Sequence, residues 1–319
     1  MTGRWAMNTL GSTGVRVSPV TLGGAPLGSM PENFGYAVAE RDAVDLVRAV
    51  LDSDIRTIDT ANGYSGGRSE ERIGRAIAQY GGLPDDVVVI TKVDPRDGDY
   101  SGERVRRSLA ESADRLGLAP LPVVHLHDPE FHDFDRMTAP GGAVDALVEA
   151  RARGDVGHIG LAGGDVHQMA RYLELGVFEV LLVHNRWTLV DRSAGDLIAR
   201  AAELGLGIVN AAVLGGGILA DPSGTSRTYG YRPASPATLA AIDAMRVVCR
   251  EWGTDLATAA IRFSTRDPRF SSTVIGISKA HRLASTVAAA TVELPSEFWD
   301  RLEDLVPSPD NWLDAEPAS

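Results

Sequence analysis

Residues 55–93 read IRTIDTANGYSGGRSEERIGRAIAQYGGLPDDVVVITKV. Two short apolar runs lie at the ends of this stretch, and an amphipathic segment with helical periodicity lies between them. The first run ends near Asp59, and the second, residues 87–93, contains Lys92. Nearly continuous apolar strands are typical of a parallel sheet that is covered on both faces. The stretch therefore predicts a strand–helix–strand unit of an α/β protein.

The same alternation is repeated along the whole chain. Eight apolar runs, each followed by a segment with helical periodicity, favour a closed (β/α)8 barrel over a doubly wound sheet. No Gly-x-Gly-x-x-Gly motif follows the first run, which argues against a Rossmann fold. Residues 8–17, NTLGSTGVRV, predict a hairpin that closes the barrel floor. No change in composition marks an internal boundary, so residues 1–319 are predicted to form a single domain. The eight runs are residues 17–24, 55–60, 87–93, 121–127, 158–163, 179–185, 207–212 and 272–278.

The composition narrows the classes of partner and location. The chain has 319 residues and a formal net charge of −12, with no basic stripe, which argues against a nucleic acid or an anionic membrane as partner. No segment approaches the roughly 20 apolar residues of a membrane span, and the N-terminus lacks a signal-peptide core. The single cysteine, Cys249, excludes an intramolecular disulfide and is expected to be a buried thiol. We expect a cytoplasmic protein that is a monomer or a small homo-oligomer.

Polar side chains lie where three successive apolar runs end. Asp59, Lys92 and His127 occupy these positions, and Tyr64 follows Asp59 within a glycine-rich bend. In a parallel barrel the chemistry lies at the C-terminal ends of the strands, and adjacent strands bring such residues together. We therefore predict that Asp59, Tyr64, Lys92 and His127 form a catalytic site.

These four side chains suit the reduction of a carbonyl group or its reverse. A phenol has a pKa near 10, and a neighbouring ammonium favours the phenolate, so Lys92 is predicted to lower the pKa of Tyr64. Asp59 would keep Lys92 charged. Tyr64 would then act as general acid in reduction and general base in oxidation, with His127 hydrogen-bonded to the reacting oxygen. None of the four supplies a hydride, so a nicotinamide cofactor is required.

Residues 59–77, DTANGYSGGRSEERIGRAI, resemble the signature of the aldo-keto reductase family, and ITKV and LHDPE match the segments that contain its lysine and histidine. The segments HDPE, NRWTLVDR and NAAVLGGGILA are most similar to the branch with D-threo-aldose (L-fucose), L-galactose and pyridoxal 4-dehydrogenases. The resemblance implies an NAD- or NADP-dependent oxidoreductase. Such an enzyme interconverts a small carbonyl compound and an alcohol, or a sugar hemiacetal and a lactone.

The cofactor is expected at the rim of the barrel. A helix predicted to begin near residues 278–282 offers backbone amides for a phosphate, and Lys279 and Arg282 add the charge that favours NADP, with NAD possible. A glycine run at 215–217 allows close approach of a pyrophosphate. The resemblance implies cofactor contacts from Gly24, Ala162, Gly163, His184, Asn210, Leu214, Gly215, Gly217, Ile277, Ser278, Lys279 and Arg282.

The sequence also offers candidate residues for contact with the substrate and leaves two alternative functions open. Phe131, His132 and Trp187 are candidate substrate contacts, although Trp187 could equally be core packing. One alternative is a non-catalytic nicotinamide-sensing protein, because Ala162-Gly163, His184 and Asn210-Ala211 stand where many family members have Ser-Asn, Gln and Ala-Tyr. A second alternative is a metal-dependent barrel hydrolase. Its ligands would be His125, His127, Asp128, His132 and Asp133, which come from only one strand and its loop. The leading prediction includes no metal.

Overall fold

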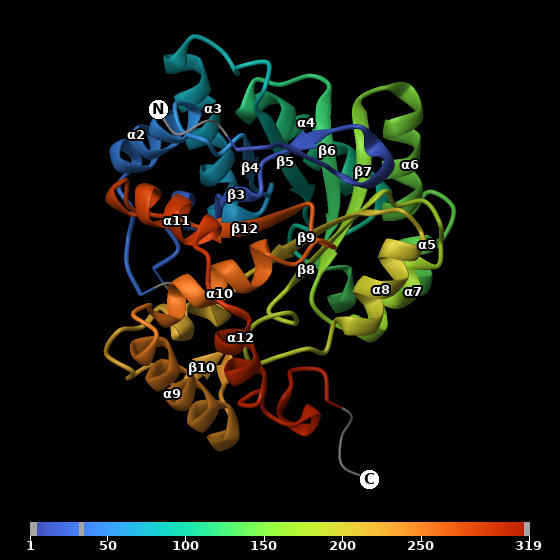
Figure 1. Cartoon of the computed structure of the whole chain (residues 1–319). Helices are drawn as coiled ribbons and strands as arrows, with labels where there is room; N and C mark the ends of the chain where they lie inside the picture. Colours follow the sequence, from blue (N-terminus) through green and yellow to red (C-terminus); the bar gives the residue numbers. More distant parts are fainter. Residues whose placement is uncertain (1–4, 32–34, 316–319) are drawn as a thin grey trace.

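The computed structural model describes residues 5–31 and 35–315. Eight parallel strands form a closed barrel in the order β12-β3-β4-β5-β6-β7-β8-β9 (Figure 1). The predicted (β/α)8 barrel is therefore confirmed. Seven of the strands lie within their predicted runs. The remaining one, β7, begins at Val156, two residues before its run. The strands are β3 (Val20–Gly23), β4 (Thr57–Asp59), β5 (Val88–Val93), β6 (Leu121–His127), β7 (Val156–Gly163), β8 (Val180–His184), β9 (Gly207–Ala211) and β12 (Ser272–Gly276).

Helices surround the barrel, and each strand is followed by at least one of them. Most of these helices bury one apolar face, which matches the amphipathic segments of the sequence. Ser101 and Asp165 are N-caps that accept a backbone hydrogen bond, and Gly117 ends its helix in the left-handed conformation. The helices are α2 (Glu40–Leu51), α3 (Arg68–Tyr80), α4 (Gly102–Leu116), α5 (Phe134–Thr138), α6 (Ala143–Arg153), α7 (Val166–Leu173), α8 (Gly195–Glu203), α9 (Pro236–Glu251), α10 (Leu256–Thr265), α11 (His281–Thr291) and α12 (Ser296–Glu303).

The strands are apolar on both faces because they separate two apolar layers. One layer packs between the strands and the helices, and the other fills the interior of the barrel. Leu10 and Val17 of the N-terminal hairpin, β1 (Asn8–Thr9) and β2 (Arg16–Val17), belong to the interior layer. Gly11 in the hairpin turn has φ +55°, and a Cβ there would lie 2.1 Å from the backbone nitrogen of Gly207. The hairpin therefore closes the floor, as predicted.

Additional elements lie beyond the C-terminal end of β9. A short helical turn, η5 (Gly215–Ala220), leads to the two-stranded β10 (Thr228–Tyr229) and β11 (Arg232–Pro233), which precede α9. In Figure 1, α9, β10 and α12 lie together below the barrel, and a second apolar cluster, which includes the buried Cys249, packs among them. The C-terminal segment is fixed by an ion pair of 2.9 Å between Asp314 and Arg186, which follows β8.

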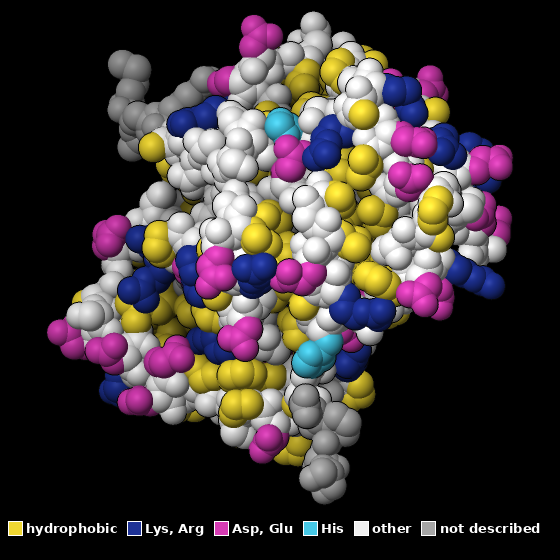
Figure 2. Space-filling model, turned by 90° about the vertical axis from the view of Figure 1, so that its right-hand side faces the viewer, with side chains coloured by type: hydrophobic (Ala, Val, Ile, Leu, Met, Phe, Trp, Pro, Cys, Tyr) yellow, Lys and Arg dark blue, Asp and Glu magenta, His cyan; other side chains and the backbone are white. Residues whose placement is uncertain are grey.

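The surface mixes charges of both signs. Figure 2 shows acidic and basic side chains side by side on the face that it presents. Arg151 pairs with Glu179 and Arg200 with Glu174, at 3.1 and 2.9 Å. Within the described ranges, no helix is long and apolar enough to cross a membrane.

Candidate active site

The four predicted catalytic residues meet at one rim of the barrel. Asp59 is the last residue of β4, Lys92 lies one residue before the end of β5, and His127 is the last residue of β6. These three strands are neighbours in the barrel. Tyr64 begins the short turn η3 (Tyr64–Gly67), which returns over the end of β4. The four residues, which lie apart in the sequence, therefore form a single cluster.

Lys92 is the centre of the cluster. Its ammonium donates hydrogen bonds to Asp59 Oδ1 and to the carbonyl oxygen of Thr60, each at 2.7 Å, and to the Tyr64 hydroxyl at 3.3 Å. The side chain is buried, with Lys92 only 1% exposed. Burial lowers the pKa of Lys92, but the Asp59 carboxylate and Tyr64 outweigh this effect and hold the pKa above its ordinary value. Lys92 is therefore a charged ammonium.

The Tyr64 phenol does not behave as the sequence predicts. Burial raises the pKa of Tyr64 well above its ordinary value, and the neighbouring Lys92 charge offsets only part of that rise. Asp59 and Asp128 raise the pKa further. Lys92 lowers the pKa of Tyr64, as predicted, but the net shift is upward, because removal of the phenol from water costs the phenolate more than one ammonium returns. Tyr64 keeps its proton at neutral pH.

His127 is oriented by a residue that the sequence reasoning missed. Asp94 accepts a hydrogen bond of 2.7 Å from His127 Nδ1, which leaves Nε2 free for the reacting oxygen. The rings of His127 and Tyr64 meet edge to face, with centroids 5.5 Å apart. Burial lowers the pKa of His127, but the Asp94 and Asp128 carboxylates outweigh it and raise the pKa above its ordinary value. The sequence signal for this partner of His127 is the acidic residue two positions after Lys92, in ITKVDP.

Asp94 also fixes the glycine-rich bend that contains Tyr64. Its second oxygen, Oδ2, accepts a hydrogen bond of 2.6 Å from the backbone nitrogen of Gly63. A Cβ on Gly63 would lie 2.8 Å from Asp94 Cγ, so a side chain does not fit there. Ser65 and Gly66 follow with φ of 53° and 66°, which turns the chain back toward the barrel. One carboxylate thus positions both His127 and the bend.

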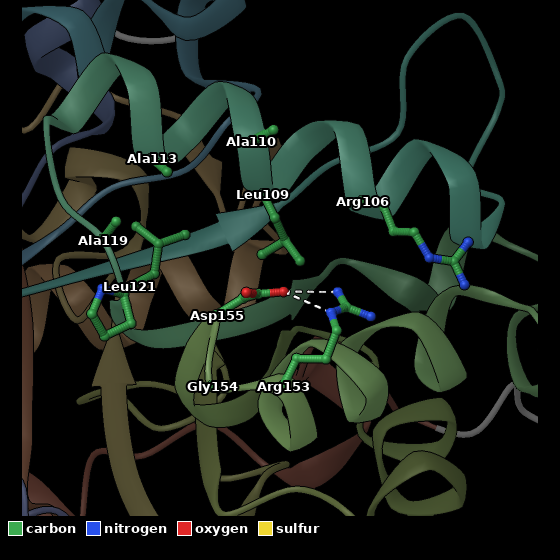
Figure 3. Close-up of a pocket in the computed structure, with 10 residues that line it drawn as sticks. Arg106, Leu109, Ala110, Ala113, Ala119, Leu121, Arg153, Gly154 and Asp155 are labelled. Atoms are coloured by element: carbon green, nitrogen blue, oxygen red, sulfur yellow. Dashed lines mark hydrogen bonds and ion pairs between the residues drawn. The ribbon is translucent and has the colours of Figure 1, made fainter.

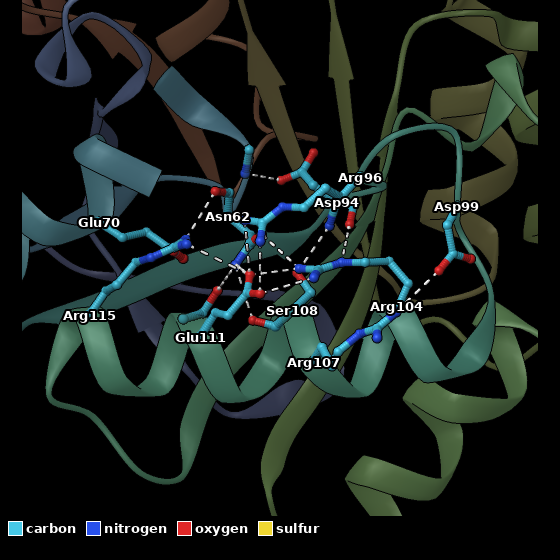
Figure 4. Close-up of polar contacts among 12 residues, drawn as sticks. Asn62, Glu70, Asp94, Arg96, Asp99, Arg104, Arg107, Ser108, Glu111 and Arg115 are labelled. Carbon is cyan, nitrogen blue, oxygen red and sulfur yellow. Dashed lines mark hydrogen bonds and ion pairs between the residues drawn. The ribbon is translucent and has the colours of Figure 1, made fainter. Parts of the chain in front are cut away.

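A polar network behind the bend makes it rigid (Figure 4). The buried side chain of Asn62 accepts a hydrogen bond from Arg104 and donates one to Glu111, at 3.1 Å each. Arg104 and Glu111 are themselves paired at 2.7 Å. On the other side, Glu70 pairs with Arg115 at 3.0 Å and accepts a 2.6 Å hydrogen bond from Thr91 of β5. Glu70, the first glutamate of the SEER segment at residues 69–72, therefore joins α3 to the barrel.

Most of the predicted cofactor residues lie on the same rim. Asn210 is an exception, because its side chain donates hydrogen bonds of 2.9 Å to the Trp187 carbonyl and to Ser264 Oγ, on the side of α10. Its side chain therefore packs behind the strand. Other predicted cofactor residues lie at the C-terminal ends of barrel strands or in the loops that follow them, namely Gly24, Ala162, Gly163, His184, Leu214, Gly215, Gly217, Ile277 and Ser278. Gly24 packs so tightly that a Cβ would lie 2.6 Å from the Asp59 carbonyl oxygen.

The predicted phosphate site has exposed charge. Lys279 precedes α11 and Arg282 is in its first turn, and both are exposed. Within residues 5–31 and 35–315 no ion pair of either side chain is found. The backbone at Gly216 and Gly217 is also exposed and has φ of 75° and 105°. These features fit a dinucleotide with its phosphates on the rim.

The predicted substrate residues have different environments. Phe131 is 78% exposed in the loop after β6, and His132 packs edge to face on Tyr100 at 4.9 Å. The Trp187 ring instead stacks on Phe263 of α10 at 6.2 Å. This contact supports the alternative in which Trp187 is a packing residue. The loop after the first predicted run, residues 31–36, is a further candidate for contact with the substrate, and its residues 32–34 lie outside the described residues.

The metal ligands of the hydrolase alternative do not come together. His125 is fully buried, and burial lowers its pKa to about 3, so it is a neutral interior histidine. In the described part of the chain the group with closely spaced ligand atoms is a different one, Asp128, Glu130 and His184. Only Asp128 is shared with the predicted set.

A separate hollow lies away from this rim. Its volume is about 580 Å³, and it is bordered by α4, by Leu121 at the start of β6 and by Asp155 just before β7. Figure 3 shows Asp155 paired with Arg153, at 2.8 Å. The starts of the strands are at the opposite end of the barrel from the catalytic cluster, so this hollow is not the active site.

A (β/α)8 barrel with a buried Asp–Lys–Tyr cluster and an adjacent histidine at the strand ends defines the class of the protein as a carbonyl–alcohol oxidoreductase. The aldo/keto reductase family model matches residues 19–307, and the chain belongs to that family. It is an NAD(P)-dependent oxidoreductase, which confirms the prediction from the sequence.

Known proteins resemble the chain over most of its length. L-galactose dehydrogenase of Arabidopsis thaliana is 31% identical over 300 residues, covering 92% of this chain and 91% of that protein. Pyridoxal 4-dehydrogenase of Microbacterium luteolum is 30% identical, covering 92% and 95%. The solved holo form of an aldo-keto reductase from Bacillus halodurans has the same fold, with a TM-score of 0.78 and 19% identity over 98% of this chain and all (100%) of that one. The predicted branch of the family is confirmed by these relatives.

Proposed function

We propose that the chain oxidises the C1 carbon of an aldose, or reduces a small aldehyde in reverse, with Tyr64 as the proton-transfer residue. The observation behind this proposal is the buried Lys92 ammonium, which is hydrogen-bonded at once to the Asp59 carboxylate and the Tyr64 hydroxyl. The relative named for a sugar substrate, L-galactose dehydrogenase, supports the choice of an aldose. The lone cysteine favours a cytoplasmic setting, and a monomer or small homo-oligomer stays our expectation.

The residues would share the chemistry as follows. Bound nicotinamide supplies the hydride that adds to the carbonyl carbon, or accepts it in oxidation. In reduction, the Tyr64 hydroxyl gives its proton to the carbonyl oxygen, and the Lys92 ammonium stabilises the resulting phenolate. In oxidation, that phenolate accepts the proton of the substrate hydroxyl. His127 Nε2 holds the reacting oxygen, because Nδ1 is occupied by Asp94.

Cofactor-linked turnover tests the proposal. Nicotinamide absorbance should change when wild-type protein and either NAD or NADP are given L-fucose, D-arabinose, L-galactose, pyridoxal or benzaldehyde. A protein that binds the cofactor in a fluorescence titration but turns over none of these substrates would contradict the proposal. That outcome would favour the nicotinamide-sensing alternative, against which the assembled cluster argues.

The preference for NADP is proposed from Lys279 and Arg282. Replacing both with Ala should weaken NADP binding by about 10-fold or more, since hydrogen bonds to charged groups contribute about 1.5–3 kcal/mol each, while NAD binding changes little. Fluorescence titration with each cofactor measures this. Arg41→Ala with Arg48→Ala on α2 removes two exposed charges elsewhere and serves as the control. Equal losses for NAD and NADP would refute the phosphate assignment.

The role of His127 predicts a pH effect. Because Nδ1 donates to Asp94, Nε2 can donate to a carbonyl oxygen only when the ring is protonated, so reduction should slow as pH rises through the pKa of His127. Asp94→Asn removes the anion that raises this pKa, and the fall should move to lower pH. The pH profile of kcat/KM for reduction measures the shift, with Asp97→Asn, an exposed carboxylate nearby, as control. An unchanged midpoint in Asp94→Asn would contradict the role.

A further inference from the structure

Asp128 presents a fixed carboxylate directly beside the catalytic histidine. It follows His127 at the end of β6 and has φ 44° and ψ 48°, the left-handed conformation that Asp and Asn tolerate better than most residues. Its backbone nitrogen donates a 2.7 Å hydrogen bond to the carbonyl oxygen of Ala162 on β7. Asp128 is therefore held in place by the barrel itself, as the four catalytic residues are.

The carboxylate has an oxygen that lacks a hydrogen-bond donor. Oδ2 lies 3.8 Å from His127 Nε2, and Oδ1 lies 3.5 Å from His184 Nε2, which is too far for a strong hydrogen bond. Among the described residues, Oδ1 is buried without a hydrogen-bond partner. Burial raises the pKa of Asp128, but His127 and His184 outweigh it and hold the pKa well below its ordinary value. The Asp128 side chain as a whole is 38% exposed, and among the described residues no hydrogen bond to Oδ2 is found, so Oδ2 is the oxygen that a ligand can reach and to which it can donate.

The Asp128 charge acts on two tyrosines. Tyr231, in the turn between β10 and β11, has φ +67° and is 58% exposed. Partial burial raises the pKa of Tyr231, and the Asp128 charge adds to the rise. The same charge also acts on Tyr64. A carboxylate beside His127 offers the hydroxyls of a sugar a hydrogen-bond acceptor.

We propose that Asp128 accepts a hydrogen bond from the hydroxyl on the carbon next to the reacting carbon, and so selects aldoses and other 2-hydroxy carbonyl compounds. This inference rests on the proposed function. The reacting oxygen lies within about 2.6–3.2 Å of His127 Nε2 in a productive complex. Since Asp128 Oδ2 is 3.8 Å from that nitrogen, a hydroxyl on the adjacent carbon can reach the carboxylate. Substrates with a carboxylate at this position are repelled by the like charge.

Two other occupants are outcomes of the test. A cation could use Asp128, Glu130 and His184, whose ligand atoms lie within 4.8 Å of one another. Glu130 Oε1, however, already accepts hydrogen bonds from the backbone nitrogens of Gly164 and Asp165, at 2.5 and 3.3 Å. The amide of the nicotinamide could also donate to Asp128, in which case the residue would govern cofactor affinity and not the choice of substrate.

The test compares two sugars that differ only in the hydroxyl in question. The readout is the ratio of kcat/KM for D-ribose to that for 2-deoxy-D-ribose, and wild-type protein should prefer D-ribose. Asp128→Ala should lower the ratio by about 10- to 100-fold, the loss of one hydrogen bond to a charged group. Asp128→Asn keeps the left-handed backbone and a neutral acceptor, so its ratio should lie between those of wild-type protein and Asp128→Ala. Asp135→Asn, an exposed carboxylate on α5, should leave the ratio unchanged. If neither pentose is oxidised, reduction of 2-hydroxypropanal and propanal gives the same comparison.

Several results would overturn the inference. One is a wild-type ratio near one, and another is an equal loss on both sugars in Asp128→Ala. A loss of cofactor affinity in that variant, with the ratio intact, would assign Asp128 to the nicotinamide amide. A ratio that collapses on chelation with EDTA would assign it to a cation. Failure of the proposed function is a different outcome, in which wild-type protein turns over no sugar and no aldehyde with either nicotinamide.

Discussion

Replacing Tyr64 with Phe is expected to lower kcat by about 10²- to 10⁴-fold, the usual contribution of a positioned general acid. The substitution removes the hydroxyl that lies 3.3 Å from Lys92 Nζ and keeps the ring that packs against His127. The fold and the affinity for the nicotinamide should therefore stay near those of wild-type protein. Steady-state kinetics with the best substrate of the panel, together with a cofactor titration, measures both quantities.

A matched control is available at the far end of α3. Tyr80 is 38% exposed and its hydroxyl donates to Asp52, away from the barrel rim, so Tyr80→Phe should leave kcat unchanged. Near-normal turnover by Tyr64→Phe would show that another group transfers the proton. A loss of cofactor affinity as large as the loss of kcat would instead make Tyr64 a binding residue.

The Asp59→Asn variant is expected to lose roughly 3–5 kcal/mol of stability, because it leaves the buried ammonium of Lys92 without its counter-charge. Asp59 and Lys92 are 4% and 1% exposed, so water cannot replace the missing carboxylate without local opening of the structure. Turnover should fall as well, since the ammonium beside Tyr64 would lose its fixed position. Urea denaturation followed by circular dichroism measures the change in the free energy of unfolding.

A double variant separates stability from catalysis. Asp59→Asn combined with Lys92→Met removes both charges, and most of the lost stability should return because no buried charge is left unpaired. Activity should not return, since the phenolate formed from Tyr64 would have no ammonium to stabilise it. If the single and double variants were equally unstable, the buried pair would not be the source of the destabilisation.

The fold could be predicted from the sequence because barrel strands are buried on both faces. Runs such as residues 121–127 are then almost purely apolar, and their even spacing leaves few alternatives to a closed barrel. The catalytic cluster could be predicted for a related reason. Asp59, Lys92 and His127 are polar residues at the ends of consecutive runs, and a parallel barrel places such ends together.

The direction in which individual side chains point could not be predicted from the sequence. Trp187 lies just after β8, where a substrate contact is plausible, yet its ring turns to Phe263 of α10. Asn210 likewise bonds toward α10, although its strand ends at the rim. Strand positions alternate between the two sides of the barrel wall, so a loop that shifts a residue by one position reverses its direction.

The net pKa shift of Tyr64 could not be predicted from the sequence either. Pairing Lys92 with Tyr64 predicts a lowered pKa for the phenol, and the charge does act in that direction. The depth of burial decides the sign, and burial depends on every residue around the site. Asp94 was missed because a histidine's orienting partner can come from any neighbouring strand. In this protein it comes from the loop after β5.

The central claim is that Tyr64, protonated at rest, gives its proton to the carbonyl oxygen as hydride is transferred. A single-turnover measurement of nicotinamide absorbance during aldehyde reduction, in H2O and in D2O, tests it directly, with cofactor and substrate saturating. Wild-type protein should react more slowly in D2O, and Tyr64→Phe should be slow in both solvents with that difference abolished. Equal rates in the two solvents for wild-type protein, or an undiminished solvent effect in Tyr64→Phe, would contradict the claim.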